Sequence, residues 1–140
     1  MQLRRVLIFP AIGAAGLLGG AANAPSIQAF GRIQPGAWTL HAFDKSVPDQ
    51  KLCIDDAYDL IQLRHPSAAC SRFVLTNDPM TATVHYTCNG AGYGRTTIKV
   101  ETGQLIHVES QGLANQSPFQ VSLEGRRAGS CEAPRGTASR

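Results

Sequence analysis

Four cysteines in a short chain are the feature that most constrains its fold. Cys53, Cys70, Cys88 and Cys131 are separated by sixteen, seventeen and forty-two residues in a sequence of 140. Structural zinc sites usually use close pairs such as Cys-x2-Cys, so this spacing favours two disulfides over a four-cysteine zinc site. The hydrophobic core of a small domain is marginal, and loops of this length, once closed, add about 3–4 kcal/mol each.

Four cysteines allow three pairings, and their spacing alone does not choose among them. We favour Cys53–Cys70 and Cys88–Cys131. The first bond would clip a helical insert between its flanking strands, and the second would tie the last strand back to the sheet. Because both bonds together consume all four thiols, the chain has no cysteine left to act as a nucleophile.

The N-terminus has the pattern of an export signal, which agrees with an oxidising compartment. Arg4 and Arg5 precede an uncharged stretch of apolar and small residues that runs to Ala22. Small residues make cleavage possible after Ala22 or Ala24, so we expect a signal peptide over 1–22. The general secretory route would then deliver the protein to the periplasm.

A membrane anchor is the alternative for the same stretch. Pro10 and several glycines weaken a spanning helix, and the stretch is at the lower limit of the roughly 17–25 residues that a span needs. We therefore expect no stable membrane span after cleavage. Removing the signal lowers the Lys and Arg count from thirteen to eleven, against ten Asp and Glu. A net charge near +1 gives no electrostatic case for binding nucleic acid.

The rest of the chain reads as one domain. We expect an extended N-terminal segment over 23–34, a single β-rich domain over 35–131 and a flexible tail over 132–140. Apolar Trp38 and Leu40 alternate with polar neighbours, which is typical of a half-buried strand. Further strands are expected over 51–54, 71–76, 80–88, 95–101, 104–111 and 119–123. The fold class is mainly β, a single antiparallel sheet that could be curved or barrel-like.

One short α-helix is expected beside this sheet. Asp55 and Asp56 offer an N-cap, and the helix must end before Pro66. A single apolar face would be formed by Ala57, Leu60, Ile61 and Leu63. Asp55, Asp56 and Asp59 cluster at the start of this helix, where capping and the helix dipole favour acidic residues. Their clustering therefore needs no explanation as a pair of catalytic carboxylates.

The order of several short motifs resembles the domain of unknown function 3617 family, small exported proteins of Gram-negative bacteria. The motifs are Pro35-Gly36-Ala37-Trp38, Cys53-Ile54-Asp55-Asp56, Cys70, Tyr86-Thr87-Cys88 and Arg126-Arg127-Ala128-Gly129-Ser130-Cys131. They span nearly all of the expected mature chain. The resemblance implies a periplasmic setting and a β-rich fold. It transfers no catalytic residues, because the family has no established activity.

Several motifs that could carry chemistry have simpler explanations. The glycine-rich stretch 90–94 lacks the following helix that a phosphate-binding loop requires, so we interpret it as a hairpin turn. Ser110 and Ser122 have no adjacent elbow motif or acid–histidine partner. Arg126 and Arg127 form an adjacent basic pair, which is typical of a solvated strand end. No cofactor is expected.

Histidines offer the remaining route to a metal or hydrolytic site. His41, His65, His85 and His107 could gather as ligands with a carboxylate such as Asp44 or Glu109. We expect His107 to face near Ile98 across the 102–103 hairpin. His85 and His107 lie on separate expected strands, which are neighbours in one possible order of the sheet.

Two classes of function follow from these patterns. The first is a non-enzymatic binding or accessory protein that uses a sheet face or barrel-like cavity for a small apolar ligand or a protein partner. The aromatic candidates for such a surface are Trp38, Phe43, Tyr86, Tyr93 and Phe119. The second is a metal-binding or hydrolytic enzyme built on His85, His107 and Glu109. The first is our prediction, and the second is the alternative.

Overall fold

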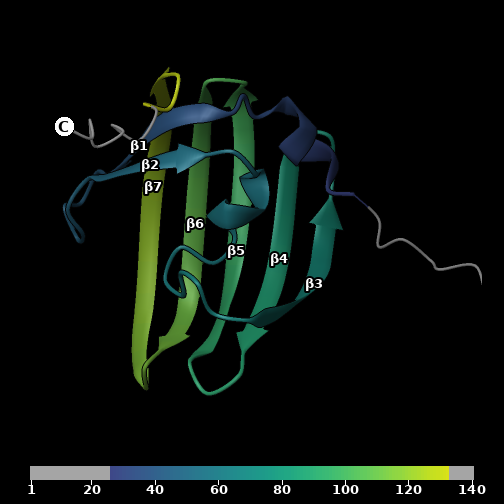
Figure 1. The fold of residues 1–140 in the computed structure, drawn as a ribbon. Helices are drawn as coiled ribbons and strands as arrows, with labels where there is room; N and C mark the ends of the chain where they lie inside the picture. The colour runs from purple at the N-terminus through teal and green to yellow at the C-terminus, as the bar shows by residue number, and fades with distance from the viewer. Residues whose placement is uncertain (1–25, 133–140) are drawn as a thin grey trace, which may run out of the picture.

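One antiparallel sheet of seven strands forms the body of the protein (Figure 1). The computed structural model describes residues 26–132. The strands are β1 (Gly36–Ala42), β2 (Gln50–Ile54), β3 (Cys70–Asn77), β4 (Thr81–Cys88), β5 (Gly92–Thr102), β6 (Leu105–Ala114) and β7 (Ser117–Gly129). Their order across the sheet is β2-β1-β7-β6-β5-β4-β3, so β2 and β3 are its edges. The prediction of a mainly β protein with a single antiparallel sheet is confirmed.

The expected signal peptide over 1–22, its two cleavage points and most of the expected C-terminal tail (133–140) lie outside the described residues. Within 26–132 the helices are two single 3-10 turns, η1 (Gln28–Arg32) and η2 (Ala57–Leu60). None of the helices in this range is long and apolar enough to cross a membrane.

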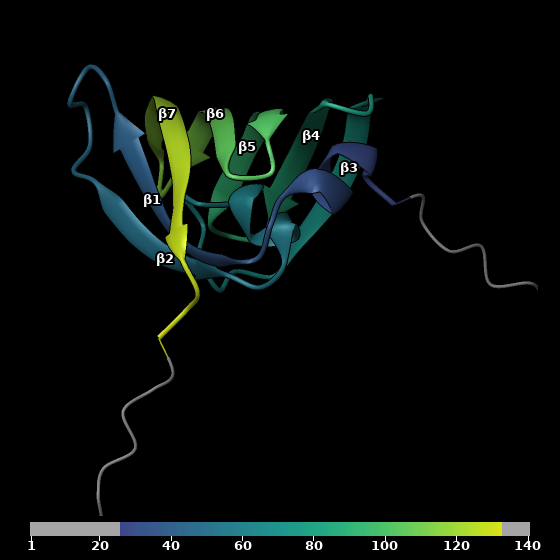
Figure 2. The same ribbon diagram turned by 90° about the horizontal axis from the view of Figure 1, so that it is seen from above.

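The sheet curves into a trough, and both 3-10 helices lie inside it (Figure 2). Side chains along each strand alternate between this inner face and the outer face. In β1, Trp38, Leu40 and Ala42 are buried on the inner face, while the residues between them are half-buried. The same alternation continues in β4, β5 and β6, and the buried side chains of the strands and both helical turns form one core.

The sequence suggested an extended segment before β1, but the structure has a helical turn there. Residues 28–32 form η1, and Ala29 and Phe30 are buried against the inner face. Ile27 and Ile33 flank this turn and are buried as well. Four apolar residues within seven positions therefore fold the segment onto the trough, because burying them outweighs the preference of a polar linker for solvent.

The predicted α-helix after Asp56 is a 3-10 helix. Asp56 is the N-cap as expected, and its carboxylate accepts from the backbone N–H of Tyr58. An α-helix would pair the Ile61 carbonyl with the N–H of His65. That carbonyl instead accepts from Thr96 Oγ1 on β5 at 2.6 Å, and His65 N–H donates to the carbonyl of Gln62. A contact with the sheet thus replaces the α-helical hydrogen bond.

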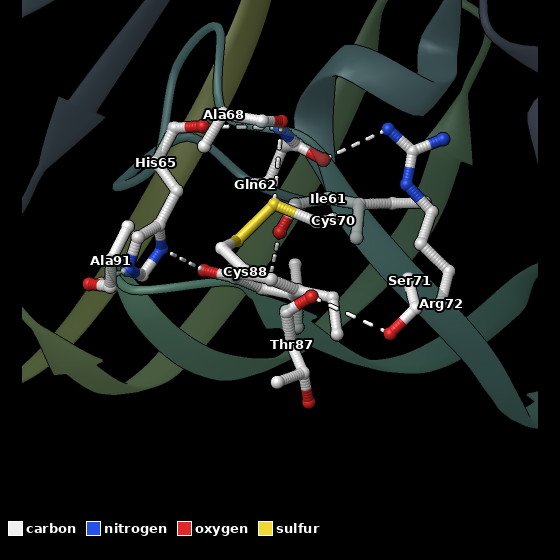
Figure 3. Close-up of a disulfide and its surroundings, with 12 residues drawn as sticks. Ile61, Gln62, His65, Ala68, Cys70, Ser71, Arg72, Thr87, Cys88 and Ala91 are labelled. Atoms are coloured by element: carbon white, nitrogen blue, oxygen red, sulfur yellow. Dashed lines mark hydrogen bonds between the residues drawn. A yellow bond between two sulfur atoms is a disulfide. The ribbon is translucent and has the colours of Figure 1, made fainter.

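All four cysteines are disulfide-bonded, but the favoured pairing is wrong. The bonds are Cys53–Cys131 and Cys70–Cys88. Cys70 lies directly opposite Cys88 in the register of β3 and β4, with 4.1 Å between their Cα atoms (Figure 3). Cys53 pairs with Ala37 in the register of β1 and β2, and β7 pairs with β1 on its other side, so the residues that follow β7 reach Cys53. Strand register, which spacing does not reveal, determines both bonds.

Candidate binding site

A cleft of about 510 Å³ opens between edge strand β2 and the segment that follows η2. We call it the seam cleft, because it lies where the sheet would have to close to become a barrel. Leu52, Leu63 and Pro66 give it apolar walls, and Lys51, Asp59 and Arg72 add charge. The lining comes from β2, from η2 and the residues that follow it (the η2 segment), and from the start of β3, which follow one another between residues 50 and 72.

Gln62 fixes one wall of the seam cleft. Its side chain is almost fully buried, and its Nε2 donates to the backbone carbonyls of His65 at 3.0 Å and Ala68 at 2.9 Å (Figure 3). Its Oε1 accepts from Arg72 Nη2 at 2.9 Å. The Arg72 guanidinium also lies 5.6 Å from the ring centre of Tyr58. These contacts hold a cation at the cleft in a fixed position, which favours an anionic or polar group in a ligand.

Behind this wall, His65 and Tyr86 form a buried pair on the inner face. His65 Nε2 is 3.1 Å from the carbonyl of Ala91, which can only accept, so Nε2 carries the proton. Nδ1 therefore accepts from the Tyr86 hydroxyl at 3.0 Å. Burial raises the pKa of Tyr86 above 10.0, which keeps the hydroxyl protonated as a donor. The Tyr86 ring needs Gly94 beneath it, because a Cβ at that position would overlap the ring.

This buried pair is an anchor for the η2 segment and not a reaction centre. Both ring nitrogens of His65 already have partners, and the histidine is 5% exposed. Ser110 is buried nearby, but its hydroxyl bonds to Thr96 Oγ1 at 2.8 Å, and Thr96 in turn bonds to the backbone of Ile61. Among residues 26–132, Ser110 has no hydrogen bond to a histidine or a carboxylate that could activate it.

The structure does not bring the candidate metal residues together. His85 on β4 and His107 on β6 share the outer face, but they lie two strands and four residues apart, about 16 Å. His107 Nε2 is 3.8 Å from Glu101, and His41 Nδ1 is 2.6 Å from Asp49. The metal-like cluster found within 26–132 is Cys53, Asp55 and Cys131, whose two sulfurs are already joined to each other.

His107 also differs from its expected register. It lies opposite Lys99, whereas Ile98 lies opposite Val108 and points into the core. A register shift between Val100 and Thr102 moves the pairing by one residue, which exchanges the two faces of a strand. His107 is therefore on the outer face, away from Ile98.

The five aromatic candidates do not gather on one surface. Trp38 and Tyr86 are fully buried in the core, and Trp38 Nε1 donates to the carbonyl of Gln34. The half-buried ring of Phe119 lies beneath the guanidinium of Arg64, 5.5 Å from it. Phe43 and Tyr93 are exposed at separate places.

The remaining candidates have local partners. Asp56 caps η2, and Asp59 faces the seam cleft. Arg126 pairs with Glu124 on its own strand, and Arg127 Nε donates to the carbonyl of Pro35 at 2.8 Å. The glycine-rich stretch 90–94 is a turn only in its first part: the turn is 89–91, and Gly92–Gly94 already belong to β5.

Sequence reasoning missed Leu52 and Arg72, since nothing marks them before the fold places β2 beside the η2 segment, and it assigned Leu63 only to the apolar face of a helix. The fold and its cleft define a disulfide-braced protein with a curved antiparallel sheet. Comparison with family models, curated proteins and solved structures finds no match to this chain.

Proposed function

We propose that this chain is an exported binding protein without enzymatic activity, and that the seam cleft holds a small amphipathic ligand. The cleft itself carries the proposal. It combines apolar walls from Leu52 and Leu63 with charged groups from Lys51 and Arg72. Small-molecule sites commonly have this composition, a mostly apolar hollow with a few polar groups that fix orientation.

Two disulfides with no free cysteine among the described residues support an oxidising compartment. Together with the N-terminal sequence pattern they support export, and we propose the periplasm as the destination. We also propose membership of the domain of unknown function 3617 family, which rests on the order of the motifs around Trp38 and the cysteines.

A fluorescent probe tests the cleft in the oxidised mature protein. Anilinonaphthalene sulfonate is amphipathic, with apolar rings for the walls of the cleft and one anionic group for its cations. We expect saturable binding to one site. Leu63→Gln should weaken it by about fivefold or more, since part of an apolar contact is lost. Lys51→Glu should weaken binding of this anionic probe and leave a neutral dye such as Nile red bound as before.

Phe43→Gln is the matched control, because Phe43 is an exposed apolar residue that does not line the cleft. It should leave probe binding unchanged. The cleft would be excluded as the site if Leu63→Gln and Lys51→Glu both bound the probe like the parent protein, or if Phe43→Gln abolished the signal.

A further inference from the structure

A row of side chains crosses the outer face of the sheet, on the opposite side from the seam cleft. In register from β3 to β7 it contains Phe73, His85, Arg95, Gln111 and Gln120. Strands lie about 4.8 Å apart, so these five positions span about 19 Å. Every member is on the outer face, because its neighbours along each strand alternate toward the trough.

Two hollows of about 320 Å³ each lie along this row. Both are lined by Arg95, Gln111 and Gln120, so they adjoin one another. One extends to Glu109, and the other extends to Tyr93. We call the two together the outer groove. It follows the direction of β5, β6 and β7, from an aromatic end at Tyr93 and Phe119 to a polar end at Glu109 and Ser122.

Exposed rings mark the aromatic end of the groove. Tyr93 is 47% exposed, and its ring centre lies 6.2 Å from that of His85. Phe119 lines the same hollow from β7 and is half-buried. These rings provide apolar faces on which a ligand can stack. Phe73, the first residue of the row, is 67% exposed but lines neither hollow, because it lies on β3 beyond His85.

Hydrogen-bonding groups of both kinds line the rest of the groove. Gln111 and Gln120 each offer a donor and an acceptor, Arg95 offers donors only, and ionised Glu109 offers acceptors only. Neither Arg95 nor Glu109 belongs to an ion pair among residues 26–132. Their charges cancel across the groove, which is polar without a net charge.

We propose that the outer groove binds a neutral glycan chain. Sugar hydroxyls require donors and acceptors side by side, and the C–H faces of sugar rings stack on exposed aromatic rings. A nucleic acid would instead require several cations to meet its phosphates, and here a single Arg95 is offset by Glu109. A protein interface has an apolar centre, whereas the centre of this groove is Arg95, Gln111 and Gln120. The proposal goes beyond the seam cleft and does not depend on it.

Titration of the mature, oxidised protein with chitohexaose and with cellohexaose tests the groove. Both are neutral, extended glycans, and binding can be followed by calorimetry or by amide chemical shifts. At least one of them should bind, with shifts confined to β4–β7. Tyr93→Ala and Gln111→Ala should each weaken binding about tenfold, since each removes one platform or one set of hydrogen bonds.

Both residues are exposed, so the variants should unfold at the same denaturant concentration as the parent protein. Phe43→Ala removes an exposed ring outside the groove and should bind like the parent. Failure of both glycans to bind would overturn the proposal. So would binding that Tyr93→Ala and Gln111→Ala leave unchanged, or binding of heparin or of a protein in place of the glycans. None of these results bears on probe binding in the seam cleft, which Leu63→Gln tests separately.

Discussion

Tyr86 shows how one residue connects the η2 segment, which was expected to be an α-helix, to the sheet. Its side chain is fully buried, its ring lies over Gly94, and its hydroxyl donates to His65. The sequence placed Tyr86 among aromatic residues of a binding surface, because alternation along β4 indicates which face it occupies but not that another segment covers that face. The partner is twenty-one positions away and belongs to no recognisable pattern.

Tyr86→Phe should destabilise the protein by about 1–2 kcal/mol at neutral pH, because His65 Nδ1 loses its buried donor. The same variant should respond less to alkaline pH. Burial raises the pKa of Tyr86 in the folded state, so above about pH 10 the unfolded chain loses a proton that the folded protein keeps. That contribution to stability is present below pH 10 and is lost as the pH rises.

Urea unfolding at pH 7 and at about pH 10.5 measures both effects. The parent protein should lose more stability between the two pH values than Tyr86→Phe does. Tyr93→Phe is the matched control, since its hydroxyl is exposed, and it should behave like the parent at both. An equally steep alkaline loss in Tyr86→Phe would contradict the assigned role.

At the scale of elements, hydrophobic alternation predicted where the strands lie but not the register in which neighbouring strands pair. The segment around Trp38 and the hairpin over 80–101 were recognisable from their own residues. Register depends on bulges, and the shift between Val100 and Thr102 is enough to move His107 away from Ile98. The apolar residues after Asp56 do have helical spacing, but Thr96 Oγ1 donates to the Ile61 carbonyl, which an α-helix would use for its own hydrogen bond.

The two disulfides should contribute unequally to stability. Their loops differ, with a sequence separation of 78 for Cys53–Cys131 and 18 for Cys70–Cys88. The chain-entropy relation gives about 4.5 kcal/mol for the first and about 3 kcal/mol for the second. Replacing each pair by alanines and comparing urea unfolding tests this. The Cys53→Ala/Cys131→Ala variant should be the less stable of the two.

A reversed order would show that local packing around the nearly buried Cys88 outweighs loop length. Thiol titration of the denatured, unreduced parent provides the first check, and it should find no free thiol. Each double variant should give the same result, since its remaining two cysteines stay bonded. A variant with free thiols would mean that the two bonds do not form independently.

At the scale of the whole molecule, the sheet was predictable and the seam cleft was not. Cysteine content and alternation together limit a chain of this size to a small braced β protein. The cleft needs β2, the η2 segment and β3 to meet, so Leu52 and Arg72 acquire a shared role only in the folded chain. The outer groove has the same origin, because Tyr93 on β5 and Gln120 on β7 line one hollow only when β6 lies between these two strands.

Export is tested by the N-terminus of the protein itself. When the full sequence is expressed in a Gram-negative host, the periplasmic protein should begin at Asn23 or Pro25, since cleavage is expected after Ala22 or Ala24. Intact mass and N-terminal sequencing measure this directly. A mature protein that retains Met1 would contradict export with cleavage. An Arg4→Glu/Arg5→Glu variant should accumulate uncleaved in the cytoplasm.

The Cys53–Cys131 bond also determines how the protein responds to a stretching force. A force applied between the two ends of the chain passes through this covalent link, so the residues between Cys53 and Cys131 carry no tension. Strands β3 to β7 all lie within that closed loop, and among the described elements η1, β1 and the start of β2 lie outside it and can be peeled away. The outer groove would therefore keep its shape under load, while the seam cleft would open first, because β2 forms one of its walls.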